Sequence, residues 1–314
     1  MGMPKSKFEI INEVVSQKNN KITITELCRI AGVSRSGYYK WLSTYEKRKE
    51  QDEKDKADFD LIVKAYYYKG YKKGARSIHM RLLHMNPPVR MNIKKIRRIM
   101  KKYNLLCPIR KSNPYRRMQA AIKTNNIADN LLNREFNKHG ARQTLLTDIT
   151  YINYLDKRCY LSTILDSYTK QVLSYCLSKS LDVDFVLETV KSLIEKHGIS
   201  LDSKTLIHSD QGCHYTSIKF IQIIKDVGLR QSMSRKGNCW DNAPQESFFG
   251  HMKDEIDLTK CKNFNEVKDI IDDWINYYNT ERYQWDLAKL SPDEYYQYLM
   301  TNEYPLPVYS KNIS

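Results

Sequence analysis

The sequence predicts an α/β domain built on a mixed five-stranded sheet and preceded by an all-helical region. From residue 141 on, apolar β-branched runs alternate with helical patterns, which is typical of an α/β domain. Three expected strands follow one another near 144–152, 158–166 and 171–178, which indicates antiparallel hairpins, and the helices that come next indicate a crossover to parallel strands. Before residue 141 the periodicity is helical and the charge is strongly positive.

The later elements of the α/β domain are expected as a helix over 183–197, a strand that ends at Asp210, a helix over 217–227 and a short strand near 230–234. A helix that carries Glu246 starts near Pro244, because proline suits the first turn of a helix. Beyond it, apolar residues repeat with helical spacing from Phe264 to Tyr278. This stripe is expected to pack in the core or to contact another protomer.

The first 50 residues predict a helix-turn-helix unit. A helix over 24–31, with Leu27 and Ile30 facing inward, is followed by a turn in which Ser34 caps a second helix. We expect Arg35, at the start of that second helix, to contact DNA.

Residues 51–107 predict a second basic unit that is also helix-turn-helix-like, and 108–140 predict a basic linker. In the last helix of the second unit, which Asn92 caps, the apolar stripe belongs to the core and the basic remainder suits phosphates better than base edges. The α/β domain is expected over 141–260, with a C-terminal helical extension over 261–314. The residues of the second unit that we expect to contact DNA are Lys72, Lys73, Arg76, Lys94, Lys95, Arg97, Arg98, Lys101 and Lys102.

Charge divides the chain near residue 140. Residues 1–140 hold 32 Lys and Arg against 12 Asp and Glu, whereas 141–314 hold 20 against 24. Between Leu61 and Ala128 there are 18 basic residues and no acidic residue, which indicates a polyanionic partner, with nucleic acid as the default. A membrane surface fits less well, because prolines interrupt the basic stretch and no apolar run is long enough to span a bilayer.

The seven cysteines are scattered and form no Cys-x-x-Cys pair. This pattern fits free thiols in a reducing cytoplasm and argues against a zinc finger. The N-terminus lacks the apolar core of a signal peptide, so the expected location is the cytoplasm.

Three acidic residues carry most of the functional information. Asp148 and Asp210 end apolar runs that predict buried strands, and Glu246 opens a helix after 35 intervening residues, so the fold must bring it to the other two. Such groups repel: at ~4 Å and an effective dielectric of ~20, one pair costs about 4 kcal/mol. A hard divalent cation bound by oxygen ligands relieves this repulsion.

The flanks of these acids resemble those of a known family. The strings are Thr147-Asp148-Ile149-Thr150-Tyr151, His208-Ser209-Asp210-Gln211-Gly212, Asp241-Asn242-Ala243 leading to Glu246-Ser247-Phe248-Phe249, and Tyr278-Asn279 followed by Arg282 and Ser291-Pro292. They are similar to the RNase H-like catalytic core of DDE transposases and retroviral integrases, and most similar to the second reading frame of the IS-three family of bacterial insertion-sequence transposases. The similarity covers nearly the whole chain, and its one departure is Leu145, where the family usually carries Trp.

The resemblance implies an enzyme that cleaves the ends of an insertion element and joins them to target DNA. It implies two Mg²⁺ or Mn²⁺ ions, which in the general two-metal scheme hold the attacking and leaving oxygens of a phosphodiester. Asp148 would bridge both ions, Asp210 would hold one and Glu246 the other, with no covalent protein intermediate. Lys253, two helical turns after Glu246, matches a Lys that meets the DNA end in integrases, or is an ordinary solvated side chain.

Other polar residues near the acids have simpler expected roles. Asp166 ends the second strand and is expected in a turn or a hydrogen bond. Asp241 and Asn242 are expected as cap and loop residues before the Glu246 helix. His208, on the Asp210 strand, either supports the acids from behind or is a packed histidine.

Two alternatives to a transposase remain at this point: a metal nuclease on the same fold that cuts with water only, and a non-catalytic DNA-binding regulator from a decayed element. The expected partners are double-stranded DNA, at the element ends and the target, and further copies of the chain on that DNA. The family also supplies an upstream reading-frame product, fused by frameshifting, whose coiled coil is absent from the first 140 residues here.

Overall fold

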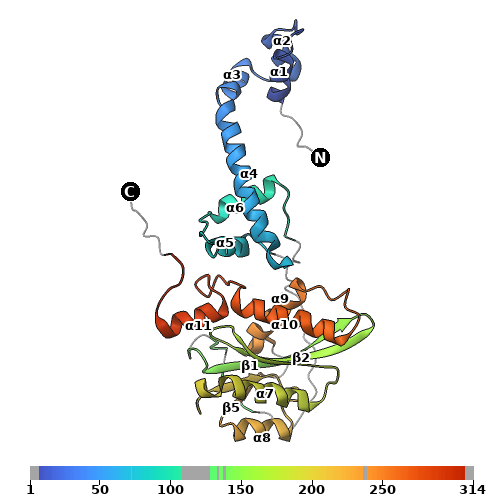
Figure 1. Cartoon of the computed structure of the whole chain (residues 1–314), viewed down its shortest axis with the longest axis vertical. Coiled ribbons are helices and arrows are strands. Elements are labelled where there is room, and N and C mark those ends of the chain that lie inside the picture. Colours follow the sequence, from blue (N-terminus) through green and yellow to red (C-terminus); the bar gives the residue numbers. More distant parts are fainter. Residues whose placement is uncertain are drawn as a thin grey trace. The chain divides into compact units, whose positions relative to one another are not determined.

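The computed structural model describes residues 7–71, 73–107, 128–132, 134–136, 139–235 and 239–307, with 239 and 240 as backbone only. Figure 1 shows the chain from end to end. The chain divides into two compact units, Met1–Val63 and Lys64–Ser314. Among the helices of the described ranges, none combines the length and the apolar character needed to cross a membrane.

The first unit is a small helical bundle. Its buried side chains are Ile11, Leu27, Cys28 and Tyr38. Ser34 caps the third helix by accepting a hydrogen bond from the backbone of Gly37, as predicted. The helices are α1 (Lys7–Val15), α2 (Ile24–Ala31), α3 (Arg35–Ser43) and the longer α4 (Tyr45–Tyr67), which runs on into the second unit.

One inward residue of α2 was predicted wrongly. Ile30 is 72% exposed, whereas Cys28 is buried beside Leu27. The stripe of α2 that packs in the bundle is Ile24, Leu27, Cys28 and Ala31, and Ile30 falls outside this helical face. Arg35, at the start of α3, is exposed.

The second unit begins with a helical part that carries most of the predicted DNA contacts. Asn92 caps its last helix by accepting a hydrogen bond from the backbone of Lys94, and Ile96, Ile99 and Met100 are buried, as the apolar stripe predicts. The elements are a 3-10 turn, η1 (Tyr68–Gly70), and the helices α5 (Ala75–Leu83) and α6 (Ile93–Lys102).

A mixed five-stranded sheet forms the centre of the second unit, which confirms the predicted fold class. Its order is β3-β2-β1-β4-β5. The first three strands pair antiparallel, β4 pairs parallel with β1, and β5 pairs parallel with β4. The strands are β1 (Thr144–Tyr154), β2 (Lys157–Asp166), β3 (Val172–Ser178), β4 (Leu206–Ser209) and β5 (Arg230–Met233).

Helices cover both faces of this sheet (Figure 1). One apolar cluster lies under α7 (Val183–His197) and α8 (Ile218–Asp226). The other lies under α9 (Ala243–Glu255) and α10 (Phe264–Thr280), so the predicted apolar stripe of α10 is core. Two 3-10 turns, η2 (Gly198–Ser200) and η3 (Cys239–Asn242), and the last helix α11 (Pro292–Thr301) complete the described elements.

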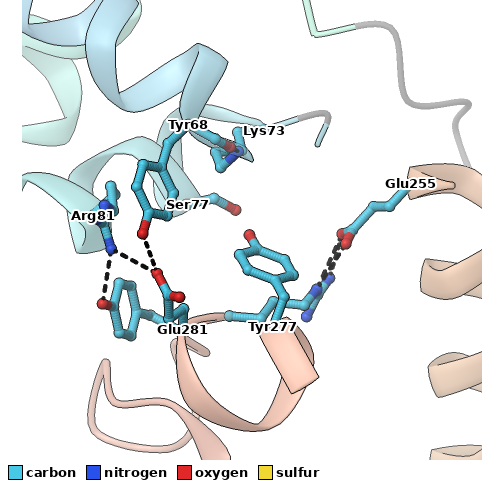
Figure 2. A pocket seen from close by; sticks show the side chains of 9 residues that line it. Tyr68, Lys73, Ser77, Arg81, Glu255, Tyr277 and Glu281 are labelled. Atoms are coloured by element: carbon cyan, nitrogen blue, oxygen red, sulfur yellow. Dashed lines mark hydrogen bonds and ion pairs between the residues drawn. The ribbon is translucent and has the colours of Figure 1, made fainter. Parts of the chain in front are cut away.

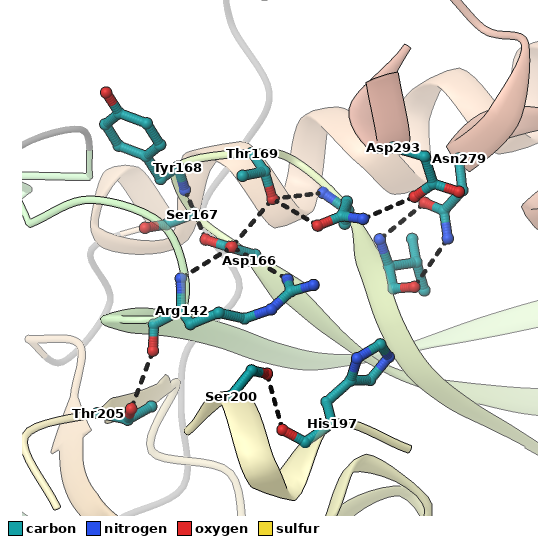
Figure 3. A network of polar contacts seen from close by, with 12 residues as sticks. Arg142, Asp166, Ser167, Tyr168, Thr169, His197, Ser200, Thr205, Asn279 and Asp293 are labelled. Carbon is teal, nitrogen blue, oxygen red and sulfur yellow. Dashed lines mark hydrogen bonds and ion pairs between the residues drawn. The ribbon is translucent and has the colours of Figure 1, made fainter. Parts of the chain in front are cut away.

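Asp166 organises the end of the sheet where β1 begins (Figure 3). It is fully buried and accepts hydrogen bonds from the Arg142 backbone at 3.0 Å and the Arg142 guanidinium at 3.2 Å. The backbone of Tyr168 and the hydroxyl of Thr169 also donate to it, both at 2.9 Å. Asp166 pairs with Leu145 across the β1–β2 ladder. Its expected role in a turn and in hydrogen bonding is therefore confirmed.

Asp166→Asn is expected to destabilise the second unit by about 3 kcal/mol, because it leaves the buried Arg142 guanidinium without its charge partner. The measurement is the urea concentration at half-unfolding, followed by tryptophan fluorescence. Asp156→Asn, at an exposed position, is the matched control and should change stability by less than about 0.5 kcal/mol. Equal midpoints for the two variants would contradict the structural role of Asp166.

Candidate active site

The pairing of β1 with β4 brings Asp148 and Asp210 together. Leu146 lies opposite His208 in this parallel pair. Continuing the same register by two residues places Asp148 opposite Asp210, which follows the last residue of β4. Neighbouring strands are about 4.8 Å apart, so the two carboxylates lie side by side where β4 ends, which is the edge of the sheet meant below.

The start of α9 is fastened to the strands at the level of Asp148. The side-chain amide of Asn242 donates to the backbone oxygen of Thr147 at 3.4 Å. The buried side chain of Gln245 donates to the hydroxyl of Thr163, which lies opposite Asp148 in the β1–β2 ladder. Glu246, the next residue, lies in the first turn of α9 and is exposed. The fold therefore brings the third acid to the edge where the first two lie.

Asp241 is the anchor of the segment before α9, a role that sequence reasoning missed. It is buried, and it accepts hydrogen bonds from Asn130 at 3.0 Å, from Arg134 at 2.7 Å and from the backbone and guanidinium of Arg235 at 3.0 Å. These donors, Arg235 first, hold the pKa of Asp241 well below its usual range. Asn242 occupies the predicted cap position, but its side chain makes no cap hydrogen bond and reaches Thr147 instead.

The other two acids act electrostatically on the carboxyl group of Asp148. Burial first, and then the neighbouring Asp210 and Glu246, raise the pKa of Asp148 to about 8, although the Ile149 N–H and Lys253 act in the opposite direction. Partial desolvation by the surrounding protein also raises the pKa of Asp210, although the residue is exposed. The hydrogen bond that Asp210 accepts from the Gly212 N–H, at 2.9 Å, acts in the opposite direction. The nearby positive charge therefore does not balance the carboxylates of the site.

Charge and donor type at this edge fit a hard divalent cation, which prefers carboxylate oxygens. As they stand in the described part of the chain, no three His, Cys, Asp or Glu side chains are arranged so that they could hold a metal ion. The carboxylates of Asp148, Asp210 and Glu246 are thus close enough to perturb the pKa of Asp148 without forming a ready-made ligand cage.

Two further residues flank the acids. Lys253, on α9, is exposed, and its ammonium lies 4.7 Å from the ring centroid of Tyr151. His208 is buried between the hydroxyls of Ser232 at 2.9 Å and Ser234 at 3.0 Å, and burial lowers its pKa to about 4. His208 is therefore neutral at physiological pH and is held as a packed histidine.

The structure changes the set of predicted DNA contacts at one position, Lys73, and leaves another, Lys72, untested. Lys72 lies outside the described residues. Lys73 is buried, donates to the backbone oxygens of Tyr71 at 2.9 Å and of Tyr68, and has its pKa lowered to about 8 by burial. This removes Lys73 from the surface open to phosphates. The exposed residues of the set are Arg35, Arg76, Lys94, Arg97, Arg98 and Lys101, and the half-buried ones are Lys95 and Lys102.

A polar junction joins the α5 region to the end of α10 within the second unit (Figure 2). Glu281 accepts hydrogen bonds from Tyr68, from Lys69 at 2.5 Å and from Arg81 at 3.4 Å. The Arg81 guanidinium lies 3.4 Å from the ring centroid of Tyr68 and donates to the Tyr283 hydroxyl at 3.1 Å. The helical part and the sheet part of this unit are therefore tied by direct contacts.

The far end of α9 is held by a buried ion pair. Glu255, the last residue of α9, accepts from Arg282 through Nε at 3.0 Å and Nη2 at 2.9 Å. The indole of Trp274 also donates to Glu255 at 3.0 Å. The side chains of Glu255 and Arg282 are 6% and 17% exposed, so little water competes with the pair. The helix that carries Glu246 is thus anchored at both ends.

Arg282→Met is expected to destabilise the second unit by about 3–5 kcal/mol, because Glu255 would stay buried without its cation. Chemical unfolding measures the loss. Lys268→Met, which breaks the more exposed Lys268–Asp272 pair on α10, is the matched control and should cost less than about 1 kcal/mol. If the two variants lose the same stability, α9 is not anchored by this pair.

Family models match most of the chain. Integrase core domain models match residues 138–239 and 227–292, and an HTH-like domain model matches residues 53–113. Among solved structures, the chain is similar to the HTLV-2 integrase catalytic core domain in complex with magnesium, at 15% identity and a TM-score of 0.37 over 48% of this chain and 94% of that chain. It is also similar to the catalytic domain of Mos1 mariner transposase, at 14% identity and a TM-score of 0.35, over 43% of this chain and 70% of that chain.

Sequence relatives extend over nearly the full length. The chain is 30% identical over 284 residues to the protein named as transposase InsK of insertion sequence IS150 in Escherichia coli K12, covering 90% of this chain and 96% of the relative. It is 31% identical to a 31 kDa protein of insertion element IS600 in Shigella sonnei, over 85% and 96% of the two chains. Transposase InsF of IS3A from Escherichia coli K12 is 23% identical over 90% and 96%. The chain is therefore a member of the insertion-sequence transposases with an integrase core domain, enzymes of the DDE type.

Proposed function

We propose that this transposase cuts the ends of its element and joins them to target DNA at Asp148, Asp210 and Glu246, with two Mg²⁺ or Mn²⁺ ions as cofactors. The observation that carries the proposal is the meeting of three carboxylates from distant parts of the chain at one edge of the sheet. Asp148 is central, because β4 and α9 approach it from two sides.

Each residue of the site has a proposed task. When bound, the metal ions supply Lewis-acid stabilisation of the attacking and leaving oxygens of the phosphodiester. Asp148 contributes oxygens between the other two acids, and Asp210 and Glu246 contribute oxygens from either side. The contacts of Asn242 and Gln245 hold Glu246 at the level of Asp148. Lys253, exposed on the same helix, contacts a phosphate of the DNA end.

The proposed DNA contacts lie in the helical regions. Exposed Lys and Arg on α6, with Arg76 on α5, meet phosphates of double-stranded DNA whatever its sequence. Arg35 begins the second helix of the N-terminal helix-turn-helix pattern and contributes to sequence preference. This division assigns affinity to the second unit and part of the specificity to the first.

The proposed organisation keeps a helix-turn-helix over 1–50, a helix-turn-helix-like unit over 51–107, a basic linker over 108–140, the catalytic core over 141–260 and its extension over 261–314. Joining two element ends requires at least two copies of the chain on DNA, with the upstream reading-frame product or fusion as a further partner. The place of action is the nucleoid of a bacterial cytoplasm.

A strand-joining assay tests the proposal against a nuclease that only hydrolyses. The substrates are a labelled duplex that carries an element end and an unlabelled target plasmid, with Mg²⁺. The expected product is labelled target DNA, formed by attack of the cut 3′-hydroxyl. If the ends are nicked but never joined to the plasmid, the protein is a nuclease that only hydrolyses.

A further inference from the structure

A separate cavity of about 500 Å³ lies in the second unit, away from the three acids. Its volume is within the range of small-ligand pockets, roughly 300–1,000 Å³. It is lined by α5, by the segment that leads into α6 and by two C-terminal loops, and none of its lining residues is Asp or Glu. An anion or a group attached to an anion is the occupant that this lining favours.

Trp285 lines this cavity from a loop whose backbone is hydrogen-bonded across its ends. The loop is closed by backbone hydrogen bonds from Gln284 to Leu290 at 2.9 Å and from Lys289 to Gln284 at 3.1 Å. Ala288 and Lys289 both adopt positive φ, at 54° and 69°, which is uncommon outside glycine and persists where surrounding contacts impose it. Despite this bracing, the Trp285 side chain is 40% exposed. A large aromatic side chain is thus carried by a hydrogen-bonded loop and stays partly exposed.

Cationic groups surround the indole of Trp285. Lys289 Nζ lies 5.4 Å from its ring centroid and the Arg76 guanidinium lies 5.8 Å away. Arg90 is a further cationic lining residue, and the His79 ring, whose pKa burial lowers, lies 6.0 Å away as a neutral aromatic neighbour. An aromatic face bordered by cations is the combination with which proteins bind a nucleic-acid base and its phosphate.

The cavity also adjoins the helix that carries the basic surface. Asn92, the cap of α6, and Ile93, its first residue, line the cavity. DNA whose backbone follows the exposed Lys and Arg of α6 would therefore pass beside Trp285. A base inside an intact duplex is covered by its neighbours, so only an unpaired base has a face free to stack on an indole.

We propose that this cavity receives one unpaired DNA base, which stacks on Trp285 while the adjacent phosphate meets Lys289 and Arg76. The proposal rests on the DNA contacts proposed above for α6, and adds that the enzyme recognises a locally opened strand next to them. Opening a paired base costs a few kcal/mol, so a strand that is already unpaired binds more tightly.

The test uses two labelled DNAs of equal length, one a blunt duplex and the other the same duplex with one end left unpaired. Binding to the full chain is followed by fluorescence anisotropy. Trp285→Ala is expected to weaken binding of the unpaired-end DNA roughly tenfold, since stacking contributes about 1–3 kcal/mol per base, and to change blunt-duplex binding less than about twofold. Trp285→Tyr, which keeps an aromatic face, should retain most of the affinity.

A fluorescent base distinguishes the loss of stacking from a folding defect in Trp285→Ala. 2-Aminopurine placed at the unpaired position should lose fluorescence when it stacks on the wild-type protein, and keep it with Trp285→Ala. Lys289→Gln should weaken unpaired-end binding at low salt, with an effect that shrinks as salt rises. Lys204→Gln, an exposed lysine outside the cavity, is the matched control.

Two results would overturn the proposal. One is unchanged 2-aminopurine fluorescence on binding of the wild-type protein. The other is an equal loss of blunt and unpaired-end binding in Trp285→Ala, which would make Trp285 part of general duplex affinity. If the cavity variants instead alter the oligomeric state measured by light scattering, the occupant is protein. In each of these cases, normal blunt-duplex binding by the wild-type protein leaves the proposed function of α6 intact.

Discussion

Asp148→Asn, Asp210→Asn and Glu246→Gln are each expected to abolish metal-dependent cleavage and joining. Each substitution replaces one ionisable carboxyl group at the edge of the sheet by an uncharged amide and keeps the shape of the side chain. The loss should be at least a thousandfold, because the reaction depends on electrostatic stabilisation that the acids provide only together with bound cations. Product formation in Mg²⁺, measured on element-end duplexes, gives the result for each variant.

DNA affinity is the control for these three variants. The exposed basic residues of α6 and α5 are unchanged in them, so duplex binding without metal should remain within a few-fold of wild type. Asp254→Asn, on α9 but outside the proposed triad, should keep activity. Cleavage above background by any one triad variant would remove that residue from the catalytic assignment.

Duplex binding by the full chain is expected to weaken roughly a thousandfold between 50 and 200 mM salt, if about six phosphates are neutralised. The reason is that exposed Lys and Arg replace cations condensed on the DNA. The measurement uses the full chain, because Tyr68, Lys69 and Arg81 contact Glu281. A fragment that ends near residue 140 would lose these contacts. The logarithm of affinity plotted against the logarithm of salt concentration gives the slope.

Replacing Lys94, Lys95, Arg97 and Arg98 together by Ala should reduce that slope by up to about four, or about one for each lost phosphate contact. Lys204→Ala with Lys225→Ala, at exposed positions outside α5 and α6, is the control and should leave the slope unchanged. A flat salt response of the wild-type protein would contradict the assignment of α6 to phosphates.

Much of the fold could be predicted from the sequence because its signals are local. The periodicity of apolar residues predicted the five strands and α7. Ser34 and Asn92, which were predicted as N-caps, begin helices in the structure. The order of the early strands predicted antiparallel pairing followed by parallel neighbours, which the sheet confirms.

The features that escaped prediction depend on partners distant in the chain. Asp241 looks like a cap residue until Arg134 and Arg235 are seen around it. Lys73 looks like another solvated lysine in a basic run, although backbone oxygens enclose it. Ile30 shows the limit of counting apolar residues on a short helix, since the packed face of α2 falls elsewhere.

The candidate site could be named from sequence because each acid lies in a specific string, Asp148 within β1, Asp210 directly after β4 and Glu246 in the first turn of α9. The side-chain contacts that support the site could not be predicted from the sequence. The ties from Asn242 to Thr147, from Gln245 to Thr163 and from Arg282 to Glu255 cross 95, 82 and 27 positions of the chain. Polar residues that far apart carry no periodic signal, so only the folded structure shows that they hold α9 in place.

The most direct test of the central claim is Mn²⁺ binding measured by electron paramagnetic resonance, with no DNA present. If Asp148, Asp210 and Glu246 form one metal site, the wild-type protein should bind Mn²⁺, Mg²⁺ should displace it, and Asp148→Asn should lose most of the binding. Asp254→Asn should bind as wild type does. Equal Mn²⁺ binding by wild type and by all three triad variants would contradict the claim that these carboxylates hold the catalytic metal.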